Sequence, residues 1–275
     1  MANSRTSPPP VVLTIAGSDS SCGAGAQADL KTFSALGCHG LTAITCIVAE
    51  VPGEVRSIQA VRPAILRDQL DVMLEAYPVA AIKTGMLLSS TLIRTVASVL
   101  GALKKRPPLV VDPVMMASSG DPLLKPGALA AYRKLLFPLA TLLTPNLDEL
   151  GLLTGEGATI RTIEGMIAAG QRLTAETGVS VLLKGGHLRG RTATDILLGP
   201  DWETHEFSVP FLKSVETHGT GCTYSAAIAA GLAKGLPLPA AVAEAKVFIT
   251  HAIAGAFRCG RAGALDQVQS DRLTR

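Results

Sequence analysis

Short, continuously apolar runs alternate along the chain with longer segments in which apolar residues recur every three or four positions. The short runs, rich in β-branched residues, predict strands at residues 11–16, 41–48, 79–83, 109–112, 140–144, 179–184 and 194–198. The longer segments predict helices at residues 25–36, 63–77, 89–104, 126–136, 147–153, 162–177, 222–234 and 238–256. Continuous apolar runs are typical of strands buried on both faces. The alternation therefore predicts an α/β fold, a mostly parallel sheet with helices on both faces.

Length and composition agree with one such domain. The chain has 275 residues, of which 48% are hydrophobic and 17% are charged, and this composition is globular rather than disordered. Three consecutive prolines at residues 8–10 predict a disordered tail over residues 1–10. No repeat or linker divides the rest, so we expect a single domain over residues 11–275.

Charge and cysteine usage narrow the classes of partner and compartment. The net charge is only +3, and the longest basic run is Lys104-Lys105-Arg106, so a nucleic-acid partner is not expected. The five cysteines include no C-x-x-C pair, which indicates neither a disulfide framework nor a zinc site. The sequence shows no signal-peptide pattern and no run of the ~18–20 apolar residues that span a bilayer. We expect a cytoplasmic protein with reduced thiols and no membrane partner.

The first strand runs into a glycine-rich stretch at residues 17–25, followed by a helix. Glycines allow close approach of a ligand to the backbone, and ligands of parallel sheets bind beyond the carboxyl ends of the strands. Residues 23–28 match G-x-G-x-x-A, and Glu50 lies 25 residues beyond Gly25, as in dinucleotide-binding proteins. An NAD-dependent dehydrogenase is therefore a competing interpretation. It is weakened by Asp19, which would repel a pyrophosphate.

A second glycine-rich stretch, THGTGC at residues 217–222, precedes a predicted helix. Backbone N–H groups at such a helix start form a nest for an anion such as phosphate. Cys222 would lie in the first turn, where the helix dipole lowers the pKa of a thiol; the alternative is a small buried residue. The chain has no Walker A motif and no protein-kinase motif set, so ATP binding would depend on this helix start.

Polar residues also follow the later strands. Asp112 ends one strand, and Asn146 and Glu149 follow another. Carboxylates hold Mg²⁺ beside nucleotide phosphates, although Asn146 and Glu149 equally suit a helix N-cap with its capping box. Lys184 would neutralise a phosphoryl group or extend its ammonium to solvent. The five histidines show no metal-ligand spacing, and we interpret them as structural or surface residues.

Together these segments resemble the hydroxymethylpyrimidine/phosphomethylpyrimidine kinases. The matching segments occur in family order and span residues 11 to about 255. They are TIAGSDSS at 14–21, QADLKTF at 27–33, KTGML at 83–87, VDPVM at 111–115, TPN at 144–146, KGGH at 184–187 and HGTGCT at 218–223.

The resemblance implies a ribokinase-like fold, usually a homodimer. It implies phosphorylation by ATP, with Mg²⁺, of 4-amino-5-hydroxymethyl-2-methylpyrimidine and of its monophosphate in thiamine biosynthesis. The substrate hydroxyl would lie beside Cys222. By resemblance, the pyrimidine pocket contains Gly17, Asp29, Glu50, Met86 and Val114. The anion hole and catalytic position contain Gly219, Gly221 and Cys222; Asn146, Lys184, Thr217 and Thr220 bind the nucleotide phosphates, and Asp112 and Glu149 bind the metal.

Two residues depart from the family pattern. Cys22 stands where the family usually has glycine, so we expect the loop to avoid a positive φ at this residue. Glu50 stands where a glutamine usually reads the pyrimidine. A glutamate only accepts hydrogen bonds, unless it or the ring nitrogen is protonated, and a charge-assisted pair would then be strong. A different heterocycle is the alternative, as in a pyridoxine or pyridoxal kinase of the same fold. A non-catalytic vitamin-binding protein is a third interpretation.

Overall fold

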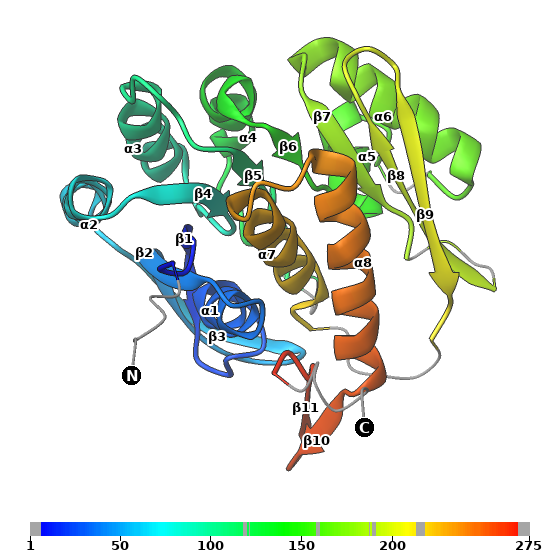
Figure 1. Ribbon diagram of the computed structural model, residues 1–275, viewed down its shortest axis with the longest axis horizontal. Coiled ribbons are helices and arrows are strands. Elements are labelled where there is room, and N and C mark those ends of the chain that lie inside the picture. Colours follow the sequence, from blue (N-terminus) through cyan, green and yellow to red (C-terminus); the bar gives the residue numbers. More distant parts are fainter. Residues whose placement is uncertain are drawn as a thin grey trace, which may run out of the picture.

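The computed structural model describes residues 7–117, 120, 122–157, 160–186, 188, 191–212 and 218–268. A nine-stranded sheet in the order β3-β2-β1-β4-β5-β6-β7-β8-β9 crosses the molecule (Figure 1). Its strands are β1 (Val11–Asp19), β2 (His39–Val51), β3 (Glu54–Ala60), β4 (Val79–Thr84), β5 (Leu109–Val111), β6 (Leu142–Leu143), β7 (Ser180–Lys184), β8 (Thr192–Leu198) and β9 (Thr204–Pro210). In the order of the sheet, neighbouring strands from β2 through β1, β4, β5 and β6 to β7 pair in parallel. The pairs β2–β3, β7–β8 and β8–β9 are antiparallel. The predicted mostly parallel sheet is confirmed.

Helices cover both faces of the sheet, as predicted (Figure 1). One face carries α1 (Gly25–Ala35), α7 (Thr220–Ala233) and α8 (Leu238–Ala254). The other carries α2 (Pro63–Ala76), α3 (Ser90–Gly101), α4 (Ala128–Ala131), α5 (Leu147–Thr154) and α6 (Ile163–Thr177), with two further helical turns, η1 (Tyr132–Leu136) and η2 (Phe137–Leu139). Each predicted helical segment overlaps one of these helices. None of the helices described is long and apolar enough to cross a membrane.

Neighbouring residues of the central strands enter different cores because side chains alternate along a strand. Val12 and Val110 pack into the core under α1, α7 and α8. Leu13 and Val111 pack into the core on the opposite face. All four are fully buried, which explains why these strands read as continuous apolar runs in the sequence.

The strands that sequence analysis missed lie at the edges of the fold. In β3 and β9 exposed residues alternate with half-buried ones, so neither strand produces an apolar run. In a separate two-stranded hairpin, β10 (Phe257–Cys259) is exposed and β11 (Ala262–Ala264) is half-buried. Residues 7–10 precede β1 without helix or strand. The rest of the predicted tail, residues 1–6, lies outside the described residues.

Candidate active site

Loops at the carboxyl ends of the parallel strands surround a cavity of about 710 Å³. Parallel strands bring their ends to one edge of the sheet, so residues far apart in sequence meet there. The predicted site residues that line this cavity are Gly17, Glu50, Met86, Asp112, Val114, Asn146, Glu149, Lys184, Gly219, Thr220, Gly221 and Cys222. The structure therefore gathers most of the predicted site in one place, while the binding role of each residue stays a prediction.

Asp29 and Thr217 are the two predicted site residues that this set does not include. Asp29 does not line the cavity, and its side chain is fully buried. The Nζ atom of Lys83 lies 2.9 Å from both carboxylate oxygens of Asp29, and the hydroxyl of Thr14 donates to the same carboxylate. The carboxylate oxygens of Asp29 are thus engaged by an internal ion pair, while its role in the pyrimidine pocket stays a prediction. Thr217 lies outside the described residues.

The loop after β1 is organised around the carboxylate of Asp19, which is 1% exposed. The backbone N–H groups of Ser21, Gly23 and Ala24 donate to it at 2.7, 3.1 and 2.7 Å. Burial raises the pKa of Asp19, but its hydrogen bonds with His218 and the loop outweigh burial and lower that pKa. Because these N–H groups already have an anionic partner, they are not available to a pyrophosphate. This arrangement argues against the dinucleotide interpretation.

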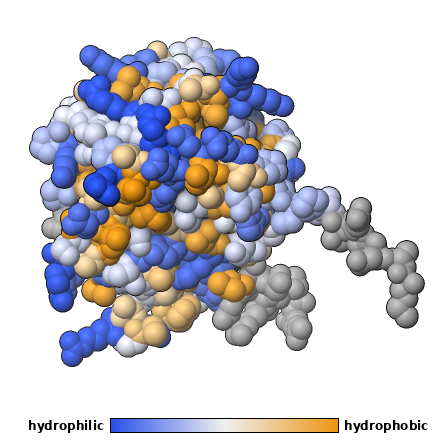
Figure 2. All heavy atoms as spheres, turned by 90° about the vertical axis from the view of Figure 1, so that its left-hand side faces the viewer, coloured by the Kyte–Doolittle hydropathy of each residue, from blue (hydrophilic) through white to orange (hydrophobic). Residues whose placement is uncertain are grey.

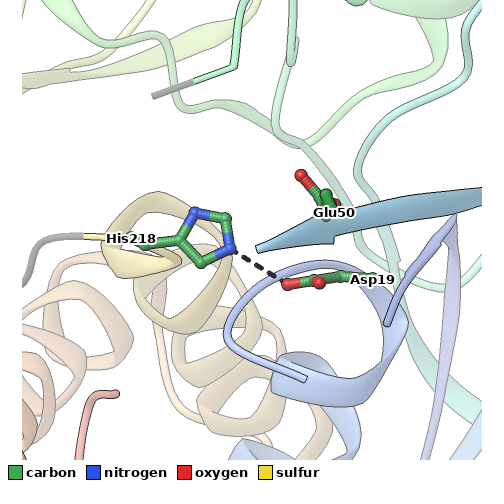
Figure 3. A group of neighbouring side chains, drawn as sticks. All are labelled: Asp19, Glu50 and His218. Carbon is green, nitrogen blue, oxygen red and sulfur yellow. Dashed lines mark hydrogen bonds and ion pairs between the residues drawn. The ribbon is translucent and has the colours of Figure 1, made fainter. Parts of the chain in front are cut away.

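His218 joins the two glycine-rich loops, a role that sequence analysis missed. Its Nε2 lies 3.0 Å from a carboxylate oxygen of Asp19 (Figure 3). The residue is 7% exposed and lines the cavity. A lone histidine without metal-ligand spacing gives no sequence signal for such a contact, since its partner lies 199 positions away.

The expectation for Cys22 was wrong, because this residue adopts a φ of 58°. Its N–H donates to the carbonyl of Asp19 at 3.0 Å, and its own carbonyl accepts from Nζ of Lys31 at 2.7 Å. These two contacts fix the peptide in the left-handed region, which costs a residue with a Cβ about 1–2 kcal/mol.

Replacing Cys22 with glycine is therefore expected to stabilise the fold by up to about 1 kcal/mol, since the added chain entropy of glycine offsets part of the gain. Urea unfolding of the wild type and the variant measures this difference. Cys22→Ala is the matched control, because it removes the thiol and keeps the Cβ. An equal gain in the alanine variant would mean that the thiol, not the backbone, is the unfavourable feature.

The second loop packs tightly against the first at Gly219. This residue has a φ of 82°, and a Cβ built on it would lie 1.8 Å from the carbonyl oxygen of Gly23. Only glycine fits both the conformation and the space. Helix α7 begins at the next residue, and Gly219 has no side chain to cap it. The first turn of the helix lines the cavity. A helix start of this kind is suited to hold an anion.

Cys222 lies in the first turn of α7, as predicted, but its thiol is not activated. Burial raises the pKa of Cys222 to about 11, a change that nearby Lys83 opposes and that Asp29 and Asp112 reinforce. The predicted lowering of this pKa is therefore wrong, because burial of the thiolate is the largest contribution and raises it. Near neutral pH the group is a thiol.

Asp112 connects three elements at the centre of the site. One carboxylate oxygen accepts from the hydroxyl of Thr144 at 3.1 Å and from Nζ of Lys184 at 3.2 Å. The other accepts from the hydroxyl of Ser225, on α7, at 3.2 Å. A Cβ built on Gly221 would lie 3.2 Å from Nζ of Lys184. The ammonium therefore lies beside the helix start rather than extending to solvent.

Asn146 and Glu149 form the capping box of α5, which confirms the structural alternative for this pair. The side chain of Asn146 accepts from the N–H of Glu149 at 2.8 Å, and the carboxylate of Glu149 accepts from the N–H of Asn146 at 2.9 Å. Burial raises the pKa of Glu149 to about 7, with Lys184 opposing and Asp112 adding to the rise. Glu149 therefore binds a proton readily, next to the carboxylate of Asp112. An oxygen-rich, negatively charged position of this kind fits Mg²⁺, which would replace that proton when bound.

The far end of the cavity is built by residues that sequence analysis did not single out. Nζ of Lys246, on α8, lies 2.6 Å from the carboxylate of Asp195, on β8, and both are buried. Asp195 also accepts from the N–H of Gly185 at 3.0 Å, so this pair holds the segment that follows Lys184. The sequence did contain a signal for this pair, because Asp195 lies inside an apolar strand and Lys246 inside an apolar helix. The apolar residues at this end are Ala193, Val209, Phe211, Leu212, Ile249 and Ile253.

The fold and the cavity define a class of protein. An α/β sheet that holds a glycine-rich helix start, a lysine and two carboxylates at one edge is the arrangement of a ribokinase-like small-molecule kinase. The family model described as phosphomethylpyrimidine kinase matches residues 19–265. The chain belongs to this family, and the resemblance seen in the sequence is confirmed.

Relatives of known name agree with this assignment. The chain is 45% identical over 249 residues to the hydroxymethylpyrimidine/phosphomethylpyrimidine kinase of Rhizobium meliloti, covering 90% of this chain and 92% of the relative. It is 46% identical over 250 residues to the thiamine biosynthesis bifunctional protein ThiED of Geobacter sulfurreducens. That match covers 91% of this chain and spans half the length of the bifunctional protein.

Solved structures show the same fold. The pyridoxal kinase of Staphylococcus aureus, in complex with AMP-PCP and pyridoxal, matches with a TM-score of 0.87 and 34% identity, covering 96% of each chain. The phosphomethylpyrimidine kinase of Clostridium difficile 630 matches with a TM-score of 0.77 and 40% identity, covering 88% of this chain and 99% of that chain.

Proposed function

We propose that the protein transfers phosphate from ATP to the hydroxymethyl group of 4-amino-5-hydroxymethyl-2-methylpyrimidine, and then to the resulting monophosphate, in thiamine biosynthesis. One observation carries this proposal: a single cavity is lined both by Glu50, Met86 and Val114 and by the helix start at Gly219–Cys222. A heterocyclic alcohol fits the first part and a nucleotide phosphate the second. The names of the sequence relatives supply the substrate.

Gly17 forms part of the wall of the proposed heterocycle pocket. A Cβ built on this residue would lie 2.8 Å from Sγ of Cys46 and 3.5 Å from Sδ of Met86. Glycine therefore lets the backbone pack directly against these two side chains, at the wall where we expect an aromatic ring to bind. Such a ring is held mainly by apolar contact, and a few polar groups fix its orientation.

Phosphoryl transfer requires alignment and charge stabilisation more than covalent chemistry. The N–H groups at the start of α7 receive the γ-phosphate, and the ammonium of Lys184 lies beside them. Asp112 and Glu149 would hold Mg²⁺, which neutralises phosphate charge when bound. Asn146 and Thr220 complete the surroundings of the phosphates. These donors stabilise charge that develops in the transition state.

Cys222 positions the substrate hydroxyl as a neutral thiol. Replacing it with alanine removes one hydrogen bond, which is worth about 0.5–1.5 kcal/mol, so kcat is expected to fall about two- to thirteen-fold. The KM for ATP should stay within experimental error. Steady-state ADP release measures both parameters. An unchanged kcat would remove Cys222 from the mechanism, and a loss beyond about 10²-fold would indicate a general base instead.

The proposed activity is tested by ADP release from Mg-ATP with the hydroxymethylpyrimidine and with pyridoxine, side by side. The proposal expects a higher kcat/KM for the pyrimidine. The structural match to a pyridoxal kinase makes the reverse preference the alternative to test, and that result would move the protein to the pyridoxine or pyridoxal kinases. Turnover of neither alcohol would overturn the substrate assignment.

The proposed assembly is a cytoplasmic homodimer. All five cysteines are free thiols, which suits a reducing compartment. Apolar side chains are exposed at Ile47 and Val51 on β2 and at Ile65 and Val72 on α2. On the side of the molecule where α2 and α3 lie, Figure 2 shows apolar patches among hydrophilic residues. Sedimentation velocity at micromolar concentration tests the dimer, and a single monomer peak would contradict it.

A further inference from the structure

Asp19, Glu50 and His218 face one another at the heterocycle end of the cavity (Figure 3). They come from the end of β1, the end of β2 and the loop before α7. One ligand atom from each lies within 4.8 Å of the others. Two carboxylates and an imidazole at this spacing must distribute their charge and protons among themselves.

The three residues are not equivalent. The carboxylate of Asp19 accepts from Ser21 N, Ser21 Oγ, Gly23 N and Ala24 N and lies 3.0 Å from Nε2 of His218. These contacts engage nearly all of its acceptor capacity. A metal ion would have to break several of them, so we interpret Asp19 and His218 as a fixed pair rather than as metal ligands.

Glu50 is held differently. Its backbone N–H and carbonyl both bond to the hydroxyl of Ser20, at 2.9 and 2.8 Å. Its carboxyl group lines the cavity and has no hydrogen-bond partner among the described residues. The backbone contact fixes where the side chain starts, and the carboxyl group is left to a ligand.

The surroundings of Glu50 make its carboxylate easier to protonate than an exposed one. Burial raises the pKa of Glu50, Asp19 raises it further, and His218 opposes the rise. Cys46, on the same strand, is buried, and burial raises its pKa, so it adds no charge. On the neighbouring β3, Arg56 pairs with exposed Glu54 at 2.9 Å and is 79% exposed.

A protonated carboxyl group, like a carboxamide, presents a donor and an acceptor side by side. That pattern complements an amidine edge, in which a ring nitrogen accepts and the adjacent amino group donates. If the proton moves to the ring nitrogen, the same two contacts form as a charge-assisted pair. In both cases one proton lies between Glu50 and the ring.

We propose that Glu50 reads the heterocycle by sharing one proton with it, so that the pocket selects an amino-substituted ring and binds it with uptake of one proton from solvent. The proposal rests on the proposed function. The proton enters with the alcohol, stays between Glu50 and the ring during phosphoryl transfer, and leaves with the product. Pyridoxine has no amino group beside its ring nitrogen, so it cannot complete both contacts.

The pH dependence follows from this coupling. The complex holds one shared proton, so affinity is greatest where only one of Glu50 and the free ring carries a proton, and it is lost as pH rises above both of their free pKa values. In that upper range, below the pKa of the shared proton in the complex, the KM of the wild type is expected to rise up to tenfold per pH unit. In Glu50→Gln the amide N–H donates without any uptake of a proton from solvent, so the KM of this variant should be flat over the same range.

Isothermal titration of the hydroxymethylpyrimidine in buffers of different ionisation enthalpy measures proton uptake directly. At a pH above the free pKa values of both Glu50 and the ring nitrogen, we expect about one proton for the wild type and none for Glu50→Gln. Glu54→Gln is the matched control, because Glu54 lies on the same hairpin and is exposed, and it should keep the uptake. Binding of Mg-AMP-PCP to each variant verifies that it is folded.

The outcomes separate this proposal from the proposed function. Turnover of the pyrimidine without proton uptake overturns proton sharing and leaves the kinase assignment in place. Proton uptake on binding without ADP release supports proton sharing and overturns the assigned activity. Equal uptake in the wild type and in Glu50→Gln assigns the proton to another group and overturns the role of Glu50. Absence of pyrimidine binding overturns both proposals.

Discussion

Replacing Gly219 with alanine is expected to lower kcat about 10²–10³-fold, the cost of losing one charge-stabilising backbone donor. The new Cβ would lie 1.8 Å from the carbonyl oxygen of Gly23 and 2.7 Å from its carbonyl carbon. Backbone atoms cannot move aside as a flexible side chain can. The two glycine-rich loops must separate, and the N–H groups at the start of α7 then lose their alignment.

The matched control is Gly235→Ala, just beyond the other end of the same helix. Gly235 has a φ of 84°, almost the same as Gly219, but a Cβ built there meets nothing within 4 Å. The control therefore carries only the backbone penalty of about 1–2 kcal/mol and should retain wild-type kcat. If both variants lose activity equally, the effect belongs to helix α7 in general and not to contact between the loops.

Replacing Lys83 with methionine is expected to lower the free energy of unfolding by about 3–5 kcal/mol, the usual cost of removing one partner of a buried ion pair. The side chains of Lys83 and Asp29 are both 0% exposed and lie 2.9 Å apart. Burial lowers the pKa of Lys83, but the carboxylate of Asp29 outweighs it and raises that pKa, so the lysine is charged. Without it, Asp29 must bury its charge alone or take up a proton.

The double variant Lys83→Met/Asp29→Asn is the control, since it removes both charges and should recover at least half of the loss. A pH series adds a second check. Burial already raises the pKa of Asp29, and Lys83 opposes this rise. Without Lys83 the folded pKa of Asp29 rises further above its unfolded value, so in Lys83→Met stability is greatest at low pH and falls as pH rises. Urea unfolding between pH 5 and 8 should show the deficit growing with pH. A single variant as stable as the wild type would mean that the pair does not support the site.

The regular part of the fold could be predicted because burial leaves a local pattern. Strands such as β1 and β4 are buried on both faces and read as apolar runs, and helix α3 shows its apolar face at helical spacing. Edge strands β3 and β9 were missed because solvent on one side breaks up the continuous apolar run that marks a strand buried on both faces. The capping box of Asn146 and Glu149 was readable because both partners lie within one turn.

The candidate site was readable only in part. Glycine-rich loops are recognisable from their local composition. The resemblance to a known family indicated Asp112, Lys184 and Cys222 as site residues. The buried location of Asp29, the raised pKa of Cys222 and the positive φ of Cys22 were predicted wrongly or not at all. Each of these depends on what packs around the residue, and short-range sequence patterns contain no such information.

By itself the sequence determined the α/β class, the order of most elements, the family and the two glycine-rich loops, because these follow from local periodicity and from motifs of adjacent residues. The tertiary structure alone decided which residues meet. It paired Asp19 with His218 across 199 positions and Asp29 with Lys83 across 54. It also desolvated Cys222 and brought Glu50 within reach of a second carboxylate. Contacts and dielectric surroundings arise only when distant segments pack, so the protonation states of the site were fixed by the fold.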